Sequence, residues 1–167
     1  MKYQEYLHQT KGFTPLLIKY YEHWYLYGYL AIAFGIFLEG DVVLYTVGFL
    51  THRGILNPYL AFLWVLAGAT FGDIVWYKLG EYLETKDNRI VRWLKKVTNP
   101  LGPYLLEHPK KSLFLSKYLY GINHAIICKA GAMHIPLKSF IRADLPANLL
   151  WIITVGGLGY ATSAGLI

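Results

Sequence analysis

Charge is scarce in this chain of 167 residues: Asp, Glu, Lys and Arg make up 16% of it, whereas hydrophobic residues make up 55%. Soluble domains usually carry about 25% charged residues, so this composition argues against the ordinary soluble class and favours an integral membrane protein. Residues 54–72 and 145–167 contain no Asp, Glu, Lys or Arg at all. Each stretch is close to the roughly 20 residues that a helix needs to cross the hydrocarbon of a bilayer. The sequence therefore predicts membrane-spanning helices.

Cysteine is almost absent, and so are the common signatures of catalysis. Cys128 is the only cysteine, which excludes an intramolecular disulfide and a thiolate-based metal cluster within one chain. The six histidines show no HxxxH or HExxH spacing, and the chain has no nucleophile elbow or glycine-rich phosphate loop. We therefore expect no metal, no cofactor and no enzymatic activity. The first residues also lack the pattern of a cleavable signal, so we expect them to remain in the mature protein.

Positive charge is present, with a formal net charge of +6, but it is unevenly placed. Nine of the sixteen Lys and Arg residues fall within residues 78–117. Cytoplasmic loops of membrane proteins carry an excess of Lys and Arg, which face anionic headgroups, so this pattern predicts a lipid surface as the partner and not nucleic acid. We expect residues 78–111 to form a basic cytoplasmic linker in a multi-pass protein of the cytoplasmic (inner) membrane.

The remaining segments differ in how their apolar runs are interrupted. Residues 1–22 resemble an amphipathic lead-in at the membrane interface. The next run is broken by Glu39, Gly40 and Asp41. Helix breaks at membrane depth are tolerated only where protein or a watery cavity satisfies the freed backbone groups, so this break predicts an internal cavity. We expect residues 34–54 to form a first re-entrant segment.

A second broken run has corresponding interruptions. Residues 118–138 are expected to form a second re-entrant segment, and an offset of 83 residues places Gly48 on Gly131 and Asp41 on His124. This similarity suggests an internal repeat. Two interrupted segments in corresponding halves are typical of a transport site between inverted repeats. The predicted fold is an all-α membrane protein with two re-entrant helical hairpins and flanking transmembrane helices, among them residues 60–77, where GxxxG spacing permits close helix contact.

Three stretches carry a resemblance to a known family. Residues 68–80, GATFGDIVWYKLG, resemble the Gly-Asp-x-x-x-Tyr-x-x-Gly signature of the DedA membrane proteins, also called SNARE-associated or VTT-domain proteins. Residues 115–151 resemble the family's later block, and residues 40–56 look like its early block. The resemblance covers residues 35–160. The positions that agree with the family pattern are Asp73, Tyr77, Gly80, Ala130, Gly131, Phe140 and Trp151.

The chain resembles a divergent member, because several family positions are changed. The departures are Lys117 and Tyr118 for Arg-Phe, Tyr120 for Pro, Asn123 for a second Arg, and Asp144 for Asn. Asp41 matches the family's second acid, and Glu39 matches the first acid if a deletion is allowed. The resemblance implies two re-entrant hairpins that meet tip to tip and a role in moving lipids across the bilayer. Undecaprenyl phosphate and phospholipids are the cargoes that it implies.

Acidic residues in the apolar runs are the first candidates for a functional site. An ionised carboxylate at bilayer depth costs about 2.5 to over 10 kcal/mol unless it is paired, hydrated or neutralised. We interpret Glu39 and Asp41 as a proton-binding pair, although a short polar turn at the surface would also explain them. Asp73 either faces the same cavity or pairs with Lys78. His124 is either a proton-linked switch or a buried core histidine.

Basic and amide residues of the second broken run are the candidates for holding a lipid phosphate. Lys117 and Lys129 act as point-charge partners in this interpretation, with Asn123 beside them. Snorkelling of the lysines to the interface is the alternative. Asn123 and Asp144 could instead bridge the helix breaks by hydrogen bonds.

These residues together predict a membrane lipid transporter that moves a phosphate-bearing lipid, with proton coupling through Glu39, Asp41, Asp73 and His124. A proton-coupled antiporter of a small cation or drug is the alternative, and an enzyme acting on lipid phosphates is a weaker one. Membrane lipids are the expected partners. The sequence leaves self-association open.

Overall fold

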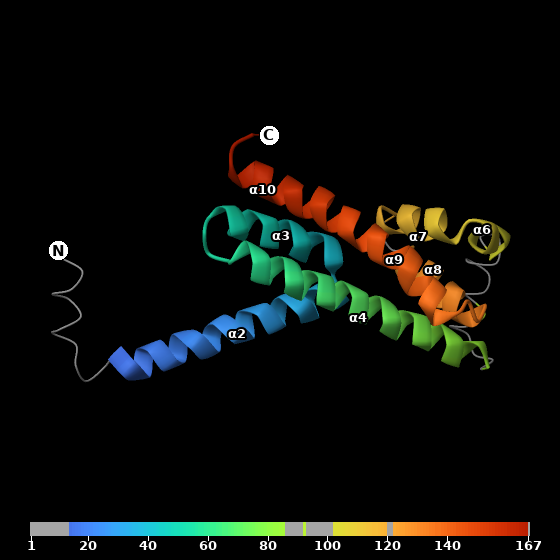
Figure 1. Cartoon of the computed structure of the whole chain (residues 1–167), viewed down its shortest axis with the longest axis horizontal. Coiled ribbons are helices and arrows are strands. Elements are labelled where there is room, and N and C mark those ends of the chain that lie inside the picture. Colours follow the sequence, from blue (N-terminus) through green and yellow to red (C-terminus); the bar gives the residue numbers. More distant parts are fainter. Residues whose placement is uncertain (1–13, 86–91, 93–101, 120–121, 167) are drawn as a thin grey trace.

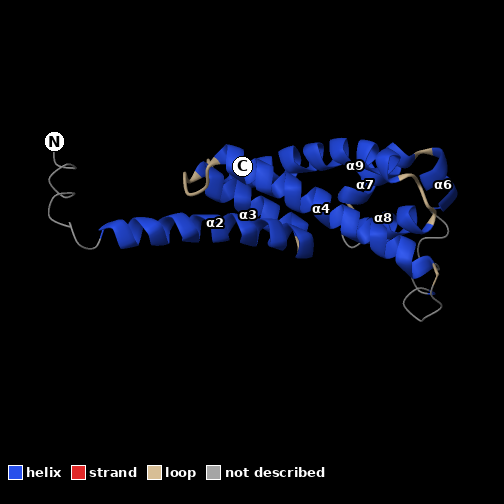
Figure 2. Ribbon diagram, turned by 60° about the horizontal axis from the view of Figure 1, so that its bottom comes forward, coloured by secondary structure: helices blue, strands red, loops and turns tan. Residues whose placement is uncertain are grey.

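The computed structural model describes residues 14–85, 92, 102–119 and 122–166. Every regular element in these ranges is a helix (Figures 1 and 2), which confirms the predicted all-α class for this part of the chain. The helices are α2 (Thr14–Leu38), α3 (Gly40–His52), α4 (Pro58–Glu84), α6 (Gly102–Glu107), α7 (Pro109–Lys117), α8 (Asn123–Ala132), α9 (Leu137–Trp151), the π-helical turn η2 (Ile152–Gly156) and α10 (Gly157–Ser163).

Two continuous helices are long and apolar enough to cross a membrane. They are Pro58–Glu84 and Leu137–Ser163, each of 27 residues, or about 40 Å at 1.5 Å per residue. The first begins before the predicted residue 60 because Pro58 occupies its first turn and Asn57 caps it, with Oδ1 accepting from the backbone N–H of Tyr59 at 3.0 Å. The second joins α9, η2 and α10 into one rod (Figure 1).

The two expected helix breaks are present. α2 ends at Leu38, α3 begins at Gly40, and the chain doubles back between them (Figure 1). α7 ends at Lys117 and α8 begins at Asn123. The predicted boundary at residue 22 is not a helix boundary, because α2 runs without interruption from Thr14; residues 1–13 lie outside the described residues. Of the predicted linker, residues 78–84 belong to α4, and residues 86–91 and 93–101 also lie outside the described residues.

Several helix crossings bring backbones into direct contact. Where α4 crosses α8, a Cβ atom on Gly80 would overlap the carbonyl of Cys128, and one on Gly131 would overlap the carbonyl of Tyr77. At the other end of the molecule α3 crosses α10, where a Cβ on Gly159 would overlap the carbonyl of Tyr45. Small residues at such contacts let membrane helices pack by close van der Waals approach.

The GxxxG pair predicted in α4 also makes a helix contact. A Cβ on Gly68 would lie 2.7 Å from the carbonyl oxygen of Ala33 in α2, and one on Gly72 would lie 3.1 Å from the ring of Phe37. The prediction of close packing at this motif is therefore confirmed, with α2 as the partner helix.

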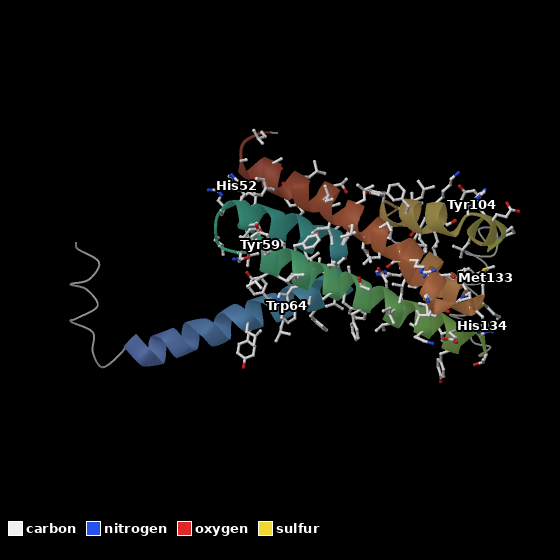
Figure 3. All side chains as sticks on the ribbon, in the orientation of Figure 1. His52, Tyr59, Trp64, Tyr104, Met133 and His134 are labelled. Carbon is white, nitrogen blue, oxygen red and sulfur yellow. The ribbon has the colours of Figure 1, made fainter. Side chains whose placement is uncertain are left out.

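The buried apolar side chains form two separate clusters. One includes Leu44, Val65 and Trp151 and joins α2, α3, the first half of α4, the end of α9 and the start of η2. The other includes Tyr77 and Phe140 and joins the second half of α4 to α6, α7, α8 and α9. His52 lies where α3 ends, at one end of the helix bundle, and His134 lies near the opposite end (Figure 3). Because the two clusters are separate, buried polar side chains can lie between them, in the middle of the molecule.

Two irregularities interrupt the long helix that contains α9. Pro146 lies inside α9, where it has no N–H to donate to the preceding turn. The π-helical turn η2 follows directly after Trp151. π turns inside α-helices are frequent at functional sites. Asn148 and Trp151 lie between these two irregularities, on the stretch of helix that faces the middle of the molecule.

Candidate functional site

A cavity of about 210 Å³ lies where the two helix breaks meet, between the two apolar clusters. Its wall comes from both breaks and from the two long helices. The lining residues are Ile36, Leu38, Glu39, Gly40, Asp41, Ala69, Asp73, Lys117, Leu119, Asn123, His124 and Trp151. Three of these side chains are carboxylates and one is an ammonium, so the cavity is charged, although it lies halfway along helices of membrane-spanning length.

One side of the cavity is an ion cluster buried among α4, α7 and α9. The Nζ atom of Lys117 lies 2.5 Å from Oδ2 of Asp73 and 3.5 Å from Oδ1 of Asp144. The amide nitrogen of Asn148 donates to Oδ2 of Asp73 at 3.0 Å and to Oδ2 of Asp144 at 2.9 Å. The exposed fractions are 5% for Asp73, 8% for Lys117, 2% for Asp144 and 0% for Asn148. Charges this deeply buried are stable only when they are paired and hydrogen-bonded.

Local helix geometry explains why these four side chains converge. Asp144 and Asn148 are four residues apart on α9 and so share one face of that helix. Lys117 is the last residue of α7, the helix that packs against α9, so its side chain enters at the second break. Asp73 lies on α4 between Ala69 of one apolar cluster and Tyr77 of the other. The cluster thus occupies the boundary between the two cores.

Hydrogen bonding in this cluster is incomplete. Within the described part of the chain, Oδ1 of Asp144 and Oδ1 of Asn148 are buried and accept no hydrogen bond. Lys117 is near enough to Asp144 Oδ1 for charge attraction, but at 3.5 Å it makes a weak contact at best. A buried acceptor without a donor costs about 1–3 kcal/mol. The cluster therefore holds more acceptor atoms than its own N–H groups satisfy.

Asp41 lies on another part of the wall and has its own partner. The indole Nε1 of Trp151 donates to Oδ1 of Asp41 at 2.7 Å. Asp41 is half-buried in the first turn of α3, where the helix dipole favours a carboxylate. Glu39, at the break itself, lines the cavity and is exposed. The two acids of the first break thus share the cavity but have different surroundings.

His124 and Asn123 form the edge of the cavity at the second break. The ring of His124 stacks on Trp76 with a centroid distance of 4.6 Å, and Trp76 stacks in turn on Phe37 at 6.5 Å. Asn123 Oδ1 accepts a hydrogen bond from Ser116 Oγ at 2.9 Å, which links the end of α7 to the start of α8. The bridging role considered for Asn123 is therefore observed, and the same residue also lines the cavity.

Six of the seven residues expected at the site line this one cavity: Glu39, Asp41, Asp73, Lys117, Asn123 and His124. Lys129 does not line it. α8 leads away from the cavity, and six residues along a helix place Lys129 about 9 Å farther on and on another face. Lys78 was the alternative partner for Asp73, but it pairs with Glu81 at 2.7 Å, and Asp73 pairs with Lys117.

Sequence reasoning missed Asp144 and Asn148 as members of the site. Their signal was two polar side chains four residues apart at the edge of a long apolar run, a spacing that aligns them on one helix face. Among the described residues, no group of three or more His, Cys, Asp or Glu side chains is arranged to hold a metal ion.

Comparisons with known proteins place the chain in a family. The VTT domain profile matches residues 30–161. The uncharacterized membrane protein YbfM of Bacillus subtilis is 28% identical over 155 residues, which cover 78% of this chain and 89% of YbfM. An uncharacterized membrane protein of Buchnera aphidicola is 28% identical over 125 residues, covering 70% of this chain and 46% of that protein.

A third relative is an inner membrane protein of Borreliella burgdorferi, 27% identical over 130 residues, which cover 74% of this chain and 60% of that protein. The chain spans most of YbfM but about half of the Buchnera proteins that it matches. No solved structure matches it significantly. The profile match extends over both helix breaks, the first long helix and all but the last two residues of the second, and so the chain is a membrane protein that belongs to the VTT-domain, or DedA, family.

Proposed function

We propose that this protein moves a phosphate-bearing lipid across the cytoplasmic membrane, coupled to protons, with the lipid headgroup passing through the central cavity. The observation that carries the proposal is a charged cavity formed where two helix breaks meet, halfway along helices of membrane-spanning length. Broken helices around a polar site near the midplane are the arrangement by which many transporters give a polar substrate a path through lipid.

In this proposal the two broken segments are re-entrant hairpins of an inverted repeat. The offset of 83 residues relates Gly40, the first residue of α3, to Asn123, the first residue of α8. α3 crosses α10 of the other half, and α8 crosses the end of α4, each through a glycine contact. This reciprocal packing supports two related halves that could rock against each other around the cavity.

Two features of the cavity suit a phosphate group. α3 and α8 both begin at the cavity, and neither Glu39 nor Ile122 caps its helix with a side-chain hydrogen bond. The first N–H groups of a helix lack intrahelical partners and attract anions. Lys117 and the ring of His124 line the same space. The proposal therefore places the phosphate between Lys117 and the start of α8.

An outer groove gives the hydrocarbon tail a place beside the cavity. The groove has a volume of about 570 Å³ and lies between α2 and α4. It is lined by Ala33, Phe34, Phe37, Trp64, Ala67, Gly68, Phe71 and Val75. Phe37 belongs to this groove and also to the aromatic row through Trp76 to His124, which borders the cavity. A lipid with its tail in the groove would have its headgroup at that row.

The test is lipid movement in vesicles that contain the purified protein. The probe is phosphatidylglycerol with a fluorescent NBD group on its headgroup. External dithionite reduces NBD only in the outer leaflet, so the loss of the remaining fluorescence reports transfer of the lipid from the inner leaflet. We expect faster loss than in protein-free vesicles, and a strong reduction by Lys117→Gln. Lys111→Gln, on the exposed side of the same helix, is the matched control. If neither phosphatidylglycerol nor a polyprenyl phosphate moves faster than without protein, the lipid proposal is wrong.

A second candidate is a proton-coupled antiporter of a small organic cation. The observation in its favour is the excess of carboxylates, because Glu39, Asp41 and Asp73 line the cavity against the ammonium of Lys117. Vesicles loaded with a pH-sensitive dye would then show proton movement when an organic cation is added, without any lipid transfer.

A further inference from the structure

We propose that Asp73 and Asp144 form the proton-binding site of this protein, sharing one proton, and that the bound proton frees Lys117 for an anionic headgroup. The first part concerns the ion cluster alone. The second part rests on the proposed function, because it assigns the released lysine to the lipid phosphate.

Charge balance is the first argument. Two carboxylates and one ammonium, all more than nine-tenths buried, leave one net negative charge at the boundary between two apolar cores. An uncompensated charge in such surroundings is expensive. One bound proton makes the cluster neutral without moving any helix.

Hydrogen-bond accounting is the second and independent argument. Oδ1 of Asp144 and Oδ1 of Asn148 are buried acceptors that lack a donor among the described residues. A protonated carboxyl group carries an O–H donor, whereas an ionised one only accepts. Protonation of the pair therefore adds an O–H donor beside two buried acceptors that have none.

The other titratable side chains around the cavity have different surroundings. Glu39 and Asp41 come from the first break and His124 from the start of α8. Asp41 already receives the indole N–H of Trp151, and the His124 ring is stacked on Trp76. Among the described residues, Asp73 and Asp144 are joined by a common amide, that of Asn148, and by a common ammonium, that of Lys117.

Proton binding changes what Lys117 can do. With both carboxylates ionised, Lys117 is held between them and the cluster repels an anion. With one proton bound, Lys117 faces a single carboxylate, the cluster is neutral, and the ammonium can turn toward a phosphate in the cavity that it already lines. The Asp144→Asn variant reproduces this neutral state permanently, because the amide keeps the shape of the side chain without its charge.

The first experiment measures the proton directly. Infrared difference spectra of the purified full chain, recorded between about pH 5.5 and about pH 8.5, should show the carbonyl stretch of one protonated carboxyl group growing as the pH falls. Asp144→Asn and Asp73→Asn should each lose this band, whereas Asp41→Asn and Glu39→Gln should keep it. A band that survives in both Asp73→Asn and Asp144→Asn overturns the proposal. If Asp144→Asn fails to fold, Asp73→Asn decides alone.

The second experiment links the proton to the headgroup. Short-chain phosphatidylglycerol is the probe, because its phosphodiester charge is constant over this pH range. The wild-type dissociation constant should fall by up to tenfold per unit of decreasing pH, as for one linked proton. Asp144→Asn should bind with the wild-type low-pH affinity at every pH, and an unchanged pH slope in this variant overturns the link. If the wild type binds no phosphatidylglycerol but the infrared result holds, the proton site stands and the lipid proposal fails.

Discussion

Replacing Lys117 by Met should destabilise the protein strongly, because it leaves two carboxylates buried without their cation. Asp73 and Asp144 are 5% and 2% exposed, and Lys117 Nζ lies 2.5 Å and 3.5 Å from them. Breaking a buried ion pair by removing one partner costs about 3–5 kcal/mol. At about 2–4 °C per kcal/mol for a chain of this size, the melting temperature should fall on the order of 10 °C.

The assay is thermal unfolding of the detergent-purified protein followed by tryptophan fluorescence. Lys111→Met is the matched control, since Lys111 is exposed on the same helix and its loss should change stability by no more than about 0.5 kcal/mol. Adding Asp73→Asn and Asp144→Asn to Lys117→Met should restore most of the lost stability, because the stranded charges are then gone. If Lys117→Met unfolds at the same temperature as Lys111→Met, the reasoning about a buried ion cluster is refuted.

Three further predictions concern other parts of the molecule. Gly80→Leu should prevent the α4–α8 crossing and give aggregated protein on size exclusion, whereas Gly28→Leu, where an added Cβ meets nothing within 4 Å, should elute like the wild type. A double-mutant cycle of Trp151→Phe and Asp41→Ala should give a coupling free energy of about 1 kcal/mol in thermal unfolding, and a value of zero would mean that their 2.7 Å hydrogen bond contributes nothing. Arg92→Cys in a cysteine-free background should react with an impermeant maleimide in inside-out vesicles and not in intact cells; labelling from outside would contradict the cytoplasmic assignment.

The helix breaks were predictable because their signals are local. Glu39, Gly40 and Asp41 interrupt an apolar run, and both the break and the cavity-lining role of these residues follow from what such an interruption requires in lipid. The same holds for Lys117, Asn123 and His124 at the second break. In each case the residues that end one helix and begin the next are also the residues that face the space between them.

The composition of the ion cluster was not predictable in the same way. Asp144 looked like a residue that bridges a backbone break, because nothing in its neighbourhood shows that α9 places it beside Lys117 and Asp73. Its role depends on the packing of three helices that are far apart in the sequence. Lys129 was placed in the cavity because it lies in the same apolar run, but the direction in which α8 leaves the break takes it elsewhere.

The π-helical turn η2 has a consequence for how the long helix can change. In an α-helix each residue turns the side-chain direction by about 100°. A π turn has more residues per turn, so it changes the direction in which all later side chains of the helix point. Before η2 the helix is phased so that Asn148 and Trp151 face the centre of the molecule; after it, Gly159 is phased toward Tyr45 of α3. Deleting one residue in this turn would rotate Gly159 by about 100° and break that crossing, while the ion cluster would keep its orientation. The length of η2 therefore sets the direction of the Gly159 face relative to the Asn148 and Trp151 face. A change in that length would redirect the Gly159 face alone.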